Sequence, residues 1–370
     1  MKQGWEIKKL GEVCNLYQPK TISGEMLVED GKYLVYGANG VIGRYNEYNH
    51  ENSEVLLTCR GATCGAINVS EPYSWINGNA MVVQPKNNDI GKMYLQHLLK
   101  AVDWSKVITG AAQPQITRQS LSPLDISIPP REEQERIVEE LDCLSGIIEK
   151  KKQQLKELDA LSESIFYQMF GDPITNEKGW EVKKLGEVAN SVNYGTSSPA
   201  TEDGYYTYIR MNNLTYSGYL DLNDVKKIDV SENEIEKCIV RKGDILFNRT
   251  NSKDLVGKTA LFDLDEEMII AGYIIRVRVN TDVVLPIYVV RYMNTPFMKT
   301  YFRNLCKGAV NQANINSKEL KAIPILMPHI ELQQEYAEKI EAIEKQKELI
   351  KKSISETETL FNARMDYYFN

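Results

Sequence analysis

The segment "GWEIKKLGEVCN" at residues 4–15 returns as "GWEVKKLGEVAN" at residues 179–190, with ten of twelve positions identical. The two copies begin 175 residues apart in a chain of 370 residues. From Ile116 and Ile315 onward, corresponding features lie a constant 199 residues apart, so the second half is 24 residues longer inside its globular part. The duplication predicts two domains of one fold, which agrees with the number expected from the chain length.

The stretch after each copy of this segment also repeats. Short apolar runs such as those at 54–59 and 243–248 predict strands between polar turns. A short helix is expected in each half, at 93–102 and at 286–302. Each half then contains a Gly-Ala loop rich in Gln and Asn, and closes at a proline. The two loops are "TGAAQPQIT" (109–117) and "KGAVNQANIN" (307–316).

A third repeated feature is an apolar stripe with alternating spacings of four and three residues, which is typical of a coiled-coil seam. Polar Lys347, Thr357 and Arg364 make the second stripe less regular. The predicted helix-seam residues are Ile137, Leu141, Leu144, Ile148, Leu155, Leu158, Ile165 and Met169 in the first stripe, and Tyr336, Ile340, Ile343, Ile350, Ile354, Phe361 and Tyr368 in the second.

Each stripe predicts a helix of roughly 35 to 40 residues, or about 55 Å. Gly171 and Pro173 should end the first helix. A helix that is polar over most of its circumference needs a partner for its apolar stripe, and we expect the two helices to pair with each other. The seam alone leaves parallel and antiparallel pairing open. An antiparallel pair would relate the two halves by a pseudo-two-fold axis.

The net charge of −7 first argues against a nucleic-acid partner. The charge is unevenly distributed, however. Residues 131–178 carry net −5 and residues 329–370 net −3, whereas residues 1–130 carry net 0 and residues 179–328 net +1. The acidity therefore belongs to the two predicted helices, and the globular parts can face phosphate.

No catalytic or metal-binding constellation is evident. His50, His97 and His329 have neither metal-ligand nor triad spacing. The segment "SKDLVGKTA" (252–260) ends like a phosphate-binding loop but has Ser252 in place of the first glycine, so we interpret it as a turn between strands. No apolar run is long enough to cross a bilayer and no secretion signal is present, which predicts a cytoplasmic protein.

The doubled "GW-E-[IV]-KKLGEV" and the exit "PPREEQERIVEEL" (129–141), in this order, resemble the specificity subunit of type I restriction–modification systems. The resemblance covers essentially the whole chain. It implies an α+β fold with two similar α/β target recognition domains and two long helices forming an antiparallel coiled coil, with pseudo-two-fold symmetry. The implied parts are recognition domain 1 (1–130), spacer helix 1 (131–176), recognition domain 2 (177–328) and spacer helix 2 (329–370).

The same resemblance implies a function without chemistry on this chain. Each recognition domain would read one half of a bipartite site in double-stranded DNA. The helices would hold two adenine-methylating subunits, with two motor-nuclease subunits attached outside. S-adenosylmethionine, and ATP with Mg, are expected on those partner subunits, and no cofactor or metal on this one.

Loop side chains that can reach base edges are the candidates for reading DNA. Arg can bond guanine in a bidentate manner and Asn or Gln can bond adenine, while Lys mostly contacts phosphate. Arg60 and Arg249 are favoured because each follows a strand at what looks like the equivalent point of its repeat. The candidates in the first half are Arg44, Arg60, Gln113, Gln115 and Arg118. Those in the second half are Arg210, Asn212, Asn213, Asn248, Arg249, Asn251, Lys253, Lys307, Asn311, Gln312 and Asn314.

Two other functions remain open from the sequence. The first is a scaffold that binds only proteins, whose two domains grip two copies of one partner. The second is an enzyme with an unfamiliar site, which the absent constellations disfavour. Salt-sensitive binding to duplex DNA would separate DNA reading from the protein scaffold.

Overall fold

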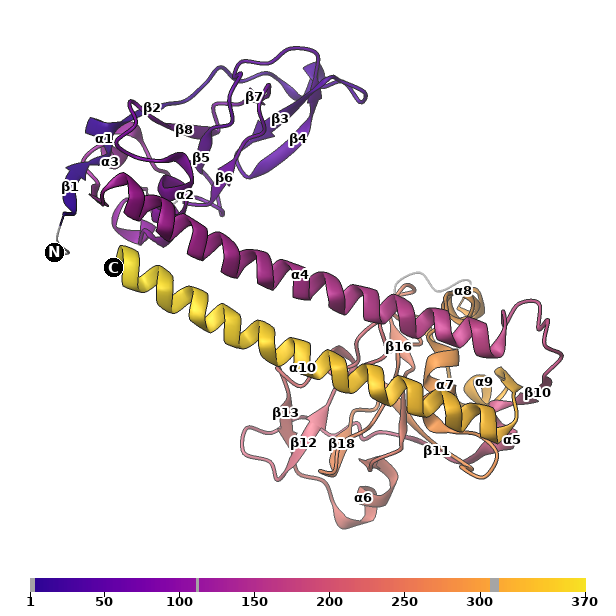
Figure 1. Cartoon of the computed structure of the whole chain (residues 1–370). Coiled ribbons are helices and arrows are strands. Elements are labelled where there is room, and N and C mark those ends of the chain that lie inside the picture. The colour runs from indigo at the N-terminus through magenta and orange to yellow at the C-terminus, as the bar shows by residue number, and fades with distance from the viewer. Residues whose placement is uncertain (1–3, 111–112, 307–312) are drawn as a thin grey trace. The chain divides into compact units, whose positions relative to one another are not determined.

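In the computed structural model, which describes residues 4–110, 113–306 and 313–370, the repeated opening segment forms the same small structure twice (Figure 1). Strand β1 (Glu6–Lys9) pairs antiparallel with β9 (Asp125–Ile128), and β10 (Glu181–Lys184) pairs with β21 (Pro324–Met327). A one-turn helix follows each, α1 (Leu10–Val13) and α5 (Leu185–Val188), and each buries its leucine. The opening segment is thus repeated because it pairs with the strand that leaves each globular part.

The chain divides into two compact units. Unit 1 comprises Met1–Gln154 and Ile350–Asn370, and unit 2 comprises Leu155–Leu349. Both long helices, α4 (Arg131–Phe170) and α10 (Ile330–Phe369), contribute one part to each unit. Helix α4 ends directly before Gly171, which has a positive φ of 80°, as the sequence predicts.

Besides the β1–β9 pair, unit 1 contains two larger sheets and a helix that covers one of them. The strands of the first sheet, in spatial order, are β2 (Cys14–Tyr17), β8 (Ala80–Pro85), β5 (Val55–Thr58) and β6 (Ile67–Val69). The second sheet has β4 (Gly40–Tyr45), β3 (Tyr33–Gly37) and β7 (Trp75–Ile76). The helices are α2 (Lys92–Ala101) and α3 (Arg118–Leu121), with 3-10 turns at Gly24–Met26 and Trp104–Lys106. Leu95 and Leu99 of α2 are fully buried in the core that the first sheet shares with the start of α4.

Unit 2 repeats the first sheet and enlarges the rest. The repeated sheet, in spatial order, is β11 (Ala189–Tyr194), β19 (Ile274–Val279), β15 (Ile245–Asn248) and β17 (Thr259–Leu261). A second sheet has β13 (Lys226–Ile228), β12 (Tyr206–Ile209), β18 (Met268–Ile270) and β14 (Ile239–Val240), and a ribbon joins β16 (Thr250–Asn251) to β20 (Ala313–Asn314). The helices are α6 (Glu232–Cys238), α7 (Pro286–Met293), α8 (Pro296–Leu305) and α9 (Ser317–Lys321), with a 3-10 turn at Met211–Asn213.

The single helix expected at 286–302 is wrong, because the structure breaks it into α7 and α8. Pro296 cannot continue the hydrogen-bonding pattern of α7, and the Thr295 side chain accepts a hydrogen bond from Met298 N to start α8. As expected, the segment 252–260 contains a turn between strands, which covers residues 252–258 between β16 and β17. Lys258 is buried there, and its ammonium donates to Leu214 O.

A glutamine fastens each long helix to its globular part. The Gln134 side chain is buried, accepts a hydrogen bond from Gly91 N at the start of α2 and donates to Asp89 O and Pro129 O. Gln333, 199 residues later, accepts from Leu285 N at the start of α7 and donates to Val283 O and Pro328 O. The amide satisfies one of the unpaired N–H groups at a helix start, which gives the proline-to-glutamine spacing of both exits a physical role.

Within unit 1 the two long helices run antiparallel. Glu140 near the start of α4 contacts Arg364 and Tyr368 near the end of α10, and Lys152 farther along α4 pairs with Glu358 at 3.2 Å. Ile137, Leu141, Ile148, Ile354 and Tyr368 of the predicted seam are buried here, while Leu144, Ile350 and Phe361 are partly exposed.

Within unit 2 the pairing is again antiparallel, with Asp159 against Lys347 and Phe166 against Tyr336. Tyr336, Ile340 and Ile343 are buried as predicted seam residues, but Leu155, Leu158, Ile165 and Met169 are only partly buried. The deepest positions at this end of α4 are instead Phe166 and Phe170, at 3% and 1% exposure. An α-helix drifts from a strict seven-residue repeat, and here the buried face turns by one residue toward α7.

Candidate nucleic-acid interface

In each unit the loop at the end of a sheet strand pairs with the exit loop that precedes the last short helix. In unit 1, Ile116 N donates to Cys59 O and Gly61 N to Pro114 O, and Arg60 forms an antiparallel bridge with Gln115. The side chains of Arg60, Gln113 and Gln115 are all exposed. Unit 1 therefore brings an arginine close to two glutamines that lie 53 and 55 residues farther along the sequence.

Unit 2 builds the same element more regularly. Ile315 N donates to Arg249 O, and β16 pairs with β20 so that Thr250 faces Asn314 and Asn251 faces Ala313. The exposed Lys253 lies two residues after the end of β16. Candidates Arg249, Asn251 and Asn314 are thus neighbours.

The two arginines do not occupy equivalent positions. The partner of Ile116 N is the carbonyl of Cys59, whereas the partner of Ile315 N is the carbonyl of Arg249. Arg249 therefore corresponds to Cys59, and Arg60 lies one residue farther along. Strand β5 ends at Thr58 and β15 ends at Asn248, which gives the same offset. Since successive side chains of an extended backbone point to opposite faces, the two side chains leave their loops differently.

Arg249 is held in a defined orientation. Its Nη2 donates to Asn314 Oδ1 at 2.8 Å, and its guanidinium lies over the Tyr194 ring at 4.9 Å from the centroid. Burial acts to raise the pKa of Tyr194. The hydrogen bond that its hydroxyl accepts from Ser317 N and the charge of Arg249 act to lower that pKa, and together they outweigh burial, so the pKa lies below its ordinary value. The role of Tyr194 could not be predicted from the sequence, because it depends on β11 lying beside the exit loop and no local motif indicates that contact.

Two of the candidate asparagines face inward. Asn248 is fully buried and donates to Thr250 O and Tyr273 O, and Asn213 is 2% exposed and donates to Asp221 O and Asp224 O. Their amides bond backbone carbonyls of their own loops and, for Asn248, also the carbonyl of Tyr273, so they shape the loops and cannot reach a base directly. Arg210 is half-buried, and its Nη2 lies 3.0 Å from Asp224 Oδ2.

The remaining candidates lie apart from the paired loops or outside the described residues. Arg44 is on β4 of the second sheet of unit 1, and its Nε donates to Gly31 O at 2.7 Å. Arg118 begins α3 and Asn212 is in the 3-10 turn at 211–213, and both are exposed. Lys307, Asn311 and Gln312 lie outside the described residues.

Within the described ranges, no group of three or more His, Cys, Asp or Glu side chains could hold a metal ion, and no helix is long and apolar enough to span a membrane. The side chains that the paired loops present are Arg, Asn and Gln, which are the groups that hydrogen-bond base edges in the major groove. The arrangement can recognise donors and acceptors on a partner.

Comparison with known proteins gives consistent results. A family model described as "Type I restriction modification DNA specificity domain" matches residues 2–160 and 177–359, which is one match for each copy of the repeat. A relative named "Type I restriction enzyme EcoKI specificity subunit", from Escherichia coli, is 25% identical over 266 residues, covering 68% of this chain. The match spans only 57% of that relative's own length.

Two further similarities extend over nearly the whole chain. The "Type I restriction enzyme MjaVIII specificity subunit" of Methanocaldococcus jannaschii is 21% identical over 387 residues, covering 95% of this chain and 90% of the relative. The crystal structure of the S subunit of a type I restriction–modification system from M. genitalium superposes with a TM-score of 0.63 over 99% of this chain and 97% of that one, at 13% identity. At that identity the superposition establishes a shared fold.

Proposed function

Because the chain belongs to the type I restriction modification DNA specificity domain family, we propose that it reads a bipartite site in double-stranded DNA, one half with each unit. The observation that supports this is the paired loop present in both units, which carries exposed Arg60 and Gln115 in unit 1 and half-buried Arg249 beside exposed Asn314 in unit 2. Arg and Asn or Gln side chains held on paired backbone can read base edges with little loss of side-chain entropy.

We further propose that the chain is the non-catalytic, cytoplasmic subunit of a larger complex. Two methyltransferase subunits would bind it, with two restriction motor-nuclease subunits, and those partners would carry S-adenosylmethionine and ATP with Mg. The duplication supports two copies of a partner. Leu161 of α4 and Leu360 of α10 are 199 residues apart and expose 47% and 50% of their surface, so both helices offer an apolar side chain at the same point of the repeat.

The near-neutral globular parts suggest that the chain alone binds DNA weakly, since neutralising phosphates supplies much of DNA affinity. The test is therefore binding to the bipartite duplex with and without the methyltransferase subunit, over a range of salt concentrations. We expect tight, sequence-specific binding only with that subunit present, and an affinity that falls steeply with salt.

The competing function is a scaffold that binds only proteins. In that case the assembled complex would distinguish altered from unaltered half-sites just as well after Arg60→Ala or Arg249→Ala, because base reading would reside in the partners. The near-neutral charge of both globular parts is compatible with this alternative, so the half-site comparison is the decisive part of the test.

A further inference from the structure

The two units treat the same buried acidic position differently. In unit 2, Asp244 directly precedes Ile245, whose strand partner is Val277, and Arg278 comes next on that strand. In unit 1, Glu54 directly precedes Val55, whose strand partner is Val83, and Gln84 comes next. Glu54 is therefore the counterpart of Asp244, and Gln84 is the counterpart of Arg278.

In unit 2 the acidic side chain has a cation of its own. Asp244 is 3% exposed, and Arg278 donates from Nε to Oδ1 at 2.7 Å and from Nη2 to Oδ2 at 3.1 Å. Such a two-point pair compensates a buried carboxylate for the water that it has lost.

In unit 1 that cation is replaced by a neutral amide. Glu54 is 4% exposed, and its Oε1 accepts one hydrogen bond from Gln84 Nε2 at 2.9 Å. Its Oε2 is buried and has no hydrogen-bond partner among the described residues. Burial raises the pKa of Glu54 even though Gln84 and the Lys92 charge act to lower it. The carboxylate thus lacks the partner that the fold provides in unit 2.

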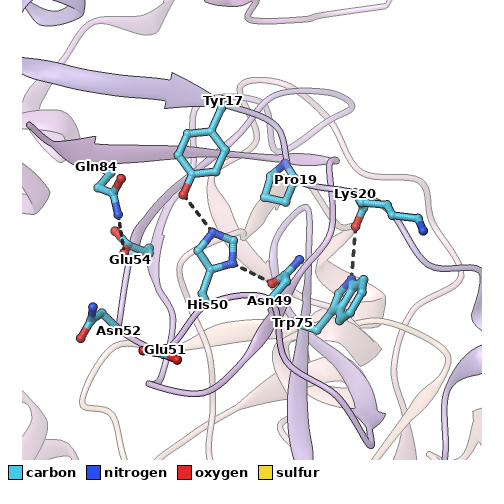
Figure 2. A pocket seen from close by; sticks show the side chains of 10 residues that line it. All are labelled: Tyr17, Pro19, Lys20, Asn49, His50, Glu51, Asn52, Glu54, Trp75 and Gln84. Carbon is cyan, nitrogen blue, oxygen red and sulfur yellow. Dashed lines mark hydrogen bonds between the residues drawn. The ribbon is translucent and has the colours of Figure 1, made fainter.

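Glu54 lines a hollow of about 550 Å³, together with Tyr17, His50, Trp75 and Gln84 (Figure 2). The hydrogen bonds that connect these side chains make the hollow rich in acceptors. Asn49 accepts from Ile76 N and donates to Ile76 O, so its Oδ1 must accept from His50 Nδ1. Burial lowers the pKa of His50, so its ring is neutral at pH 7, and Nε2 accepts a hydrogen bond from the Tyr17 hydroxyl, with the two atoms 3.0 Å apart. The Tyr17 oxygen therefore keeps its lone pairs for an incoming donor.

We propose that this pocket binds the guanidinium group of an arginine side chain from a partner polypeptide, which supplies to Glu54 the positive charge that Arg278 supplies to Asp244 in unit 2. A guanidinium supplies a positive charge, and it has several N–H groups from which Glu54 and Tyr17 can accept hydrogen bonds. Trp75 also lines the pocket, and an indole ring attracts a cation that lies over its face. A nucleobase amino group would donate to Glu54 but would leave its charge uncompensated. The site is independent of whether the chain reads DNA.

The histidines provide the measurement. The chain has three, and only His50 lines the pocket, so the ring signals of His97 and His329 in the histidine-labelled full-length protein serve as internal references. Titration with N-acetyl-L-arginine methylamide should shift the His50 signals alone. Glu54→Gln should weaken this binding by about tenfold or more, and the matched control Glu51→Gln, at an exposed residue of the same pocket, by less than about threefold.

A second variant guards against failure of Glu54→Gln to fold. Gln84→Arg rebuilds the pair of unit 2 inside unit 1, so it should abolish binding of the probe while leaving the melting temperature equal or higher. The proposal is overturned if Glu54→Gln or a folded Gln84→Arg binds the probe as tightly as the unaltered chain. It is also overturned if cytidine shifts the His50 signals as strongly as the arginine probe, or if the probe causes no shift.

Discussion

In unit 2, Nζ of Lys347 lies 2.6 Å from Oδ1 of Asp159, so an ion pair joins α10 to α4 across the helix seam. Lys347 is 3% exposed and also donates to the Tyr219 hydroxyl at 2.8 Å. Burial alone would lower the pKa of Lys347, but its bonds to Asp159 and Tyr219 raise it. A raised pKa means that the stabilisation is fully present at neutral pH and is lost only as pH rises through that value.

Lys347→Ala should therefore destabilise the protein by about 3 kcal/mol, because it removes a buried cation and leaves its polar partners without one. Lys345→Ala is the matched control on the same helix. The Lys345 side chain is 70% exposed, and within the described residues its one ion pair is with Glu341 at 2.6 Å. Its effect should stay within about 0.5 kcal/mol. Urea unfolding of both variants checks this, and equal effects would mean that the pair across the seam contributes no more than a surface contact.

Met169 belongs to the buried face of α4 that the heptad pattern predicts, whereas its neighbour Phe170 belongs to the buried face that the structure shows. Phe170 is 1% exposed and packs against Tyr288 and Tyr336, at ring distances of 4.8 and 5.0 Å. Phe170→Ala should cost about 3–5 kcal/mol, whereas Met169→Ala should cost clearly less because Met169 is only partly buried. Thermal unfolding of the two variants measures both losses of stability. A larger loss of stability for Met169→Ala would mean that the heptad pattern describes the buried face of α4 correctly.

The difference between Met169 and Phe170 shows which parts of the helix pairing can be predicted from the sequence and which cannot. The repeat at 4–15 and 179–190, the two long helices and the helix end at Gly171 follow from local patterns, and the structure confirms the helices and that end. The seam leaves the direction of pairing open, and the antiparallel arrangement that the resemblance implies is confirmed by the pair of Asp159 with Lys347 in unit 2. The inward turn at Phe166 and Phe170 could not be predicted, because it depends on the globular part that packs against the flank of α4. A seven-residue pattern describes only the contact of one helix with another.

The candidate interface shows the same limit. Arg60 and Gln115, or Arg249 and Asn314, could each be selected by residue type, but their pairing depends on backbone bridges between distant loops. The inward-facing Asn248 and Asn213 resemble exposed loop asparagines in the sequence, because their hydrogen bonds go to carbonyls that only the folded loop brings near. The counterpart of Glu54 became identifiable only from the register of β15 with β19.

Lys299 should give unit 2 a characteristic pH dependence. Burial lowers its pKa to about 7, while its ammonium donates to Asn294 Oδ1 at 2.6 Å. The unfolded chain binds this proton up to the ordinary lysine pKa of about 10.4, so the folded state should gain stability as pH rises from about 7. Lys299→Met should be more stable than the unaltered chain at pH 6, and this advantage should shrink by at most about 1.4 kcal/mol per pH unit above pH 7. An advantage that does not change with pH would show that Lys299 stays charged in the fold.

Arg249 and Arg60 should contribute to different half-sites. Each replacement by Ala should weaken recognition of one half-site by about 1–3 kcal/mol if the side chain contacts a base, and should leave subunit assembly intact. Titrating duplexes with one altered half checks this. Equal loss on all sequences would assign that arginine to phosphate contact.

Mapping of methylated adenines, in cells that contain this chain and its methyltransferase subunit, tests most directly whether the two units read two half-sites. The expected result is a single motif with two specific parts separated by a gap of fixed length, in which Arg249→Ala relaxes one part and Arg60→Ala the other. A continuous motif, or a two-part motif that neither replacement alters while the complex still assembles, would contradict the division of DNA reading between the two units.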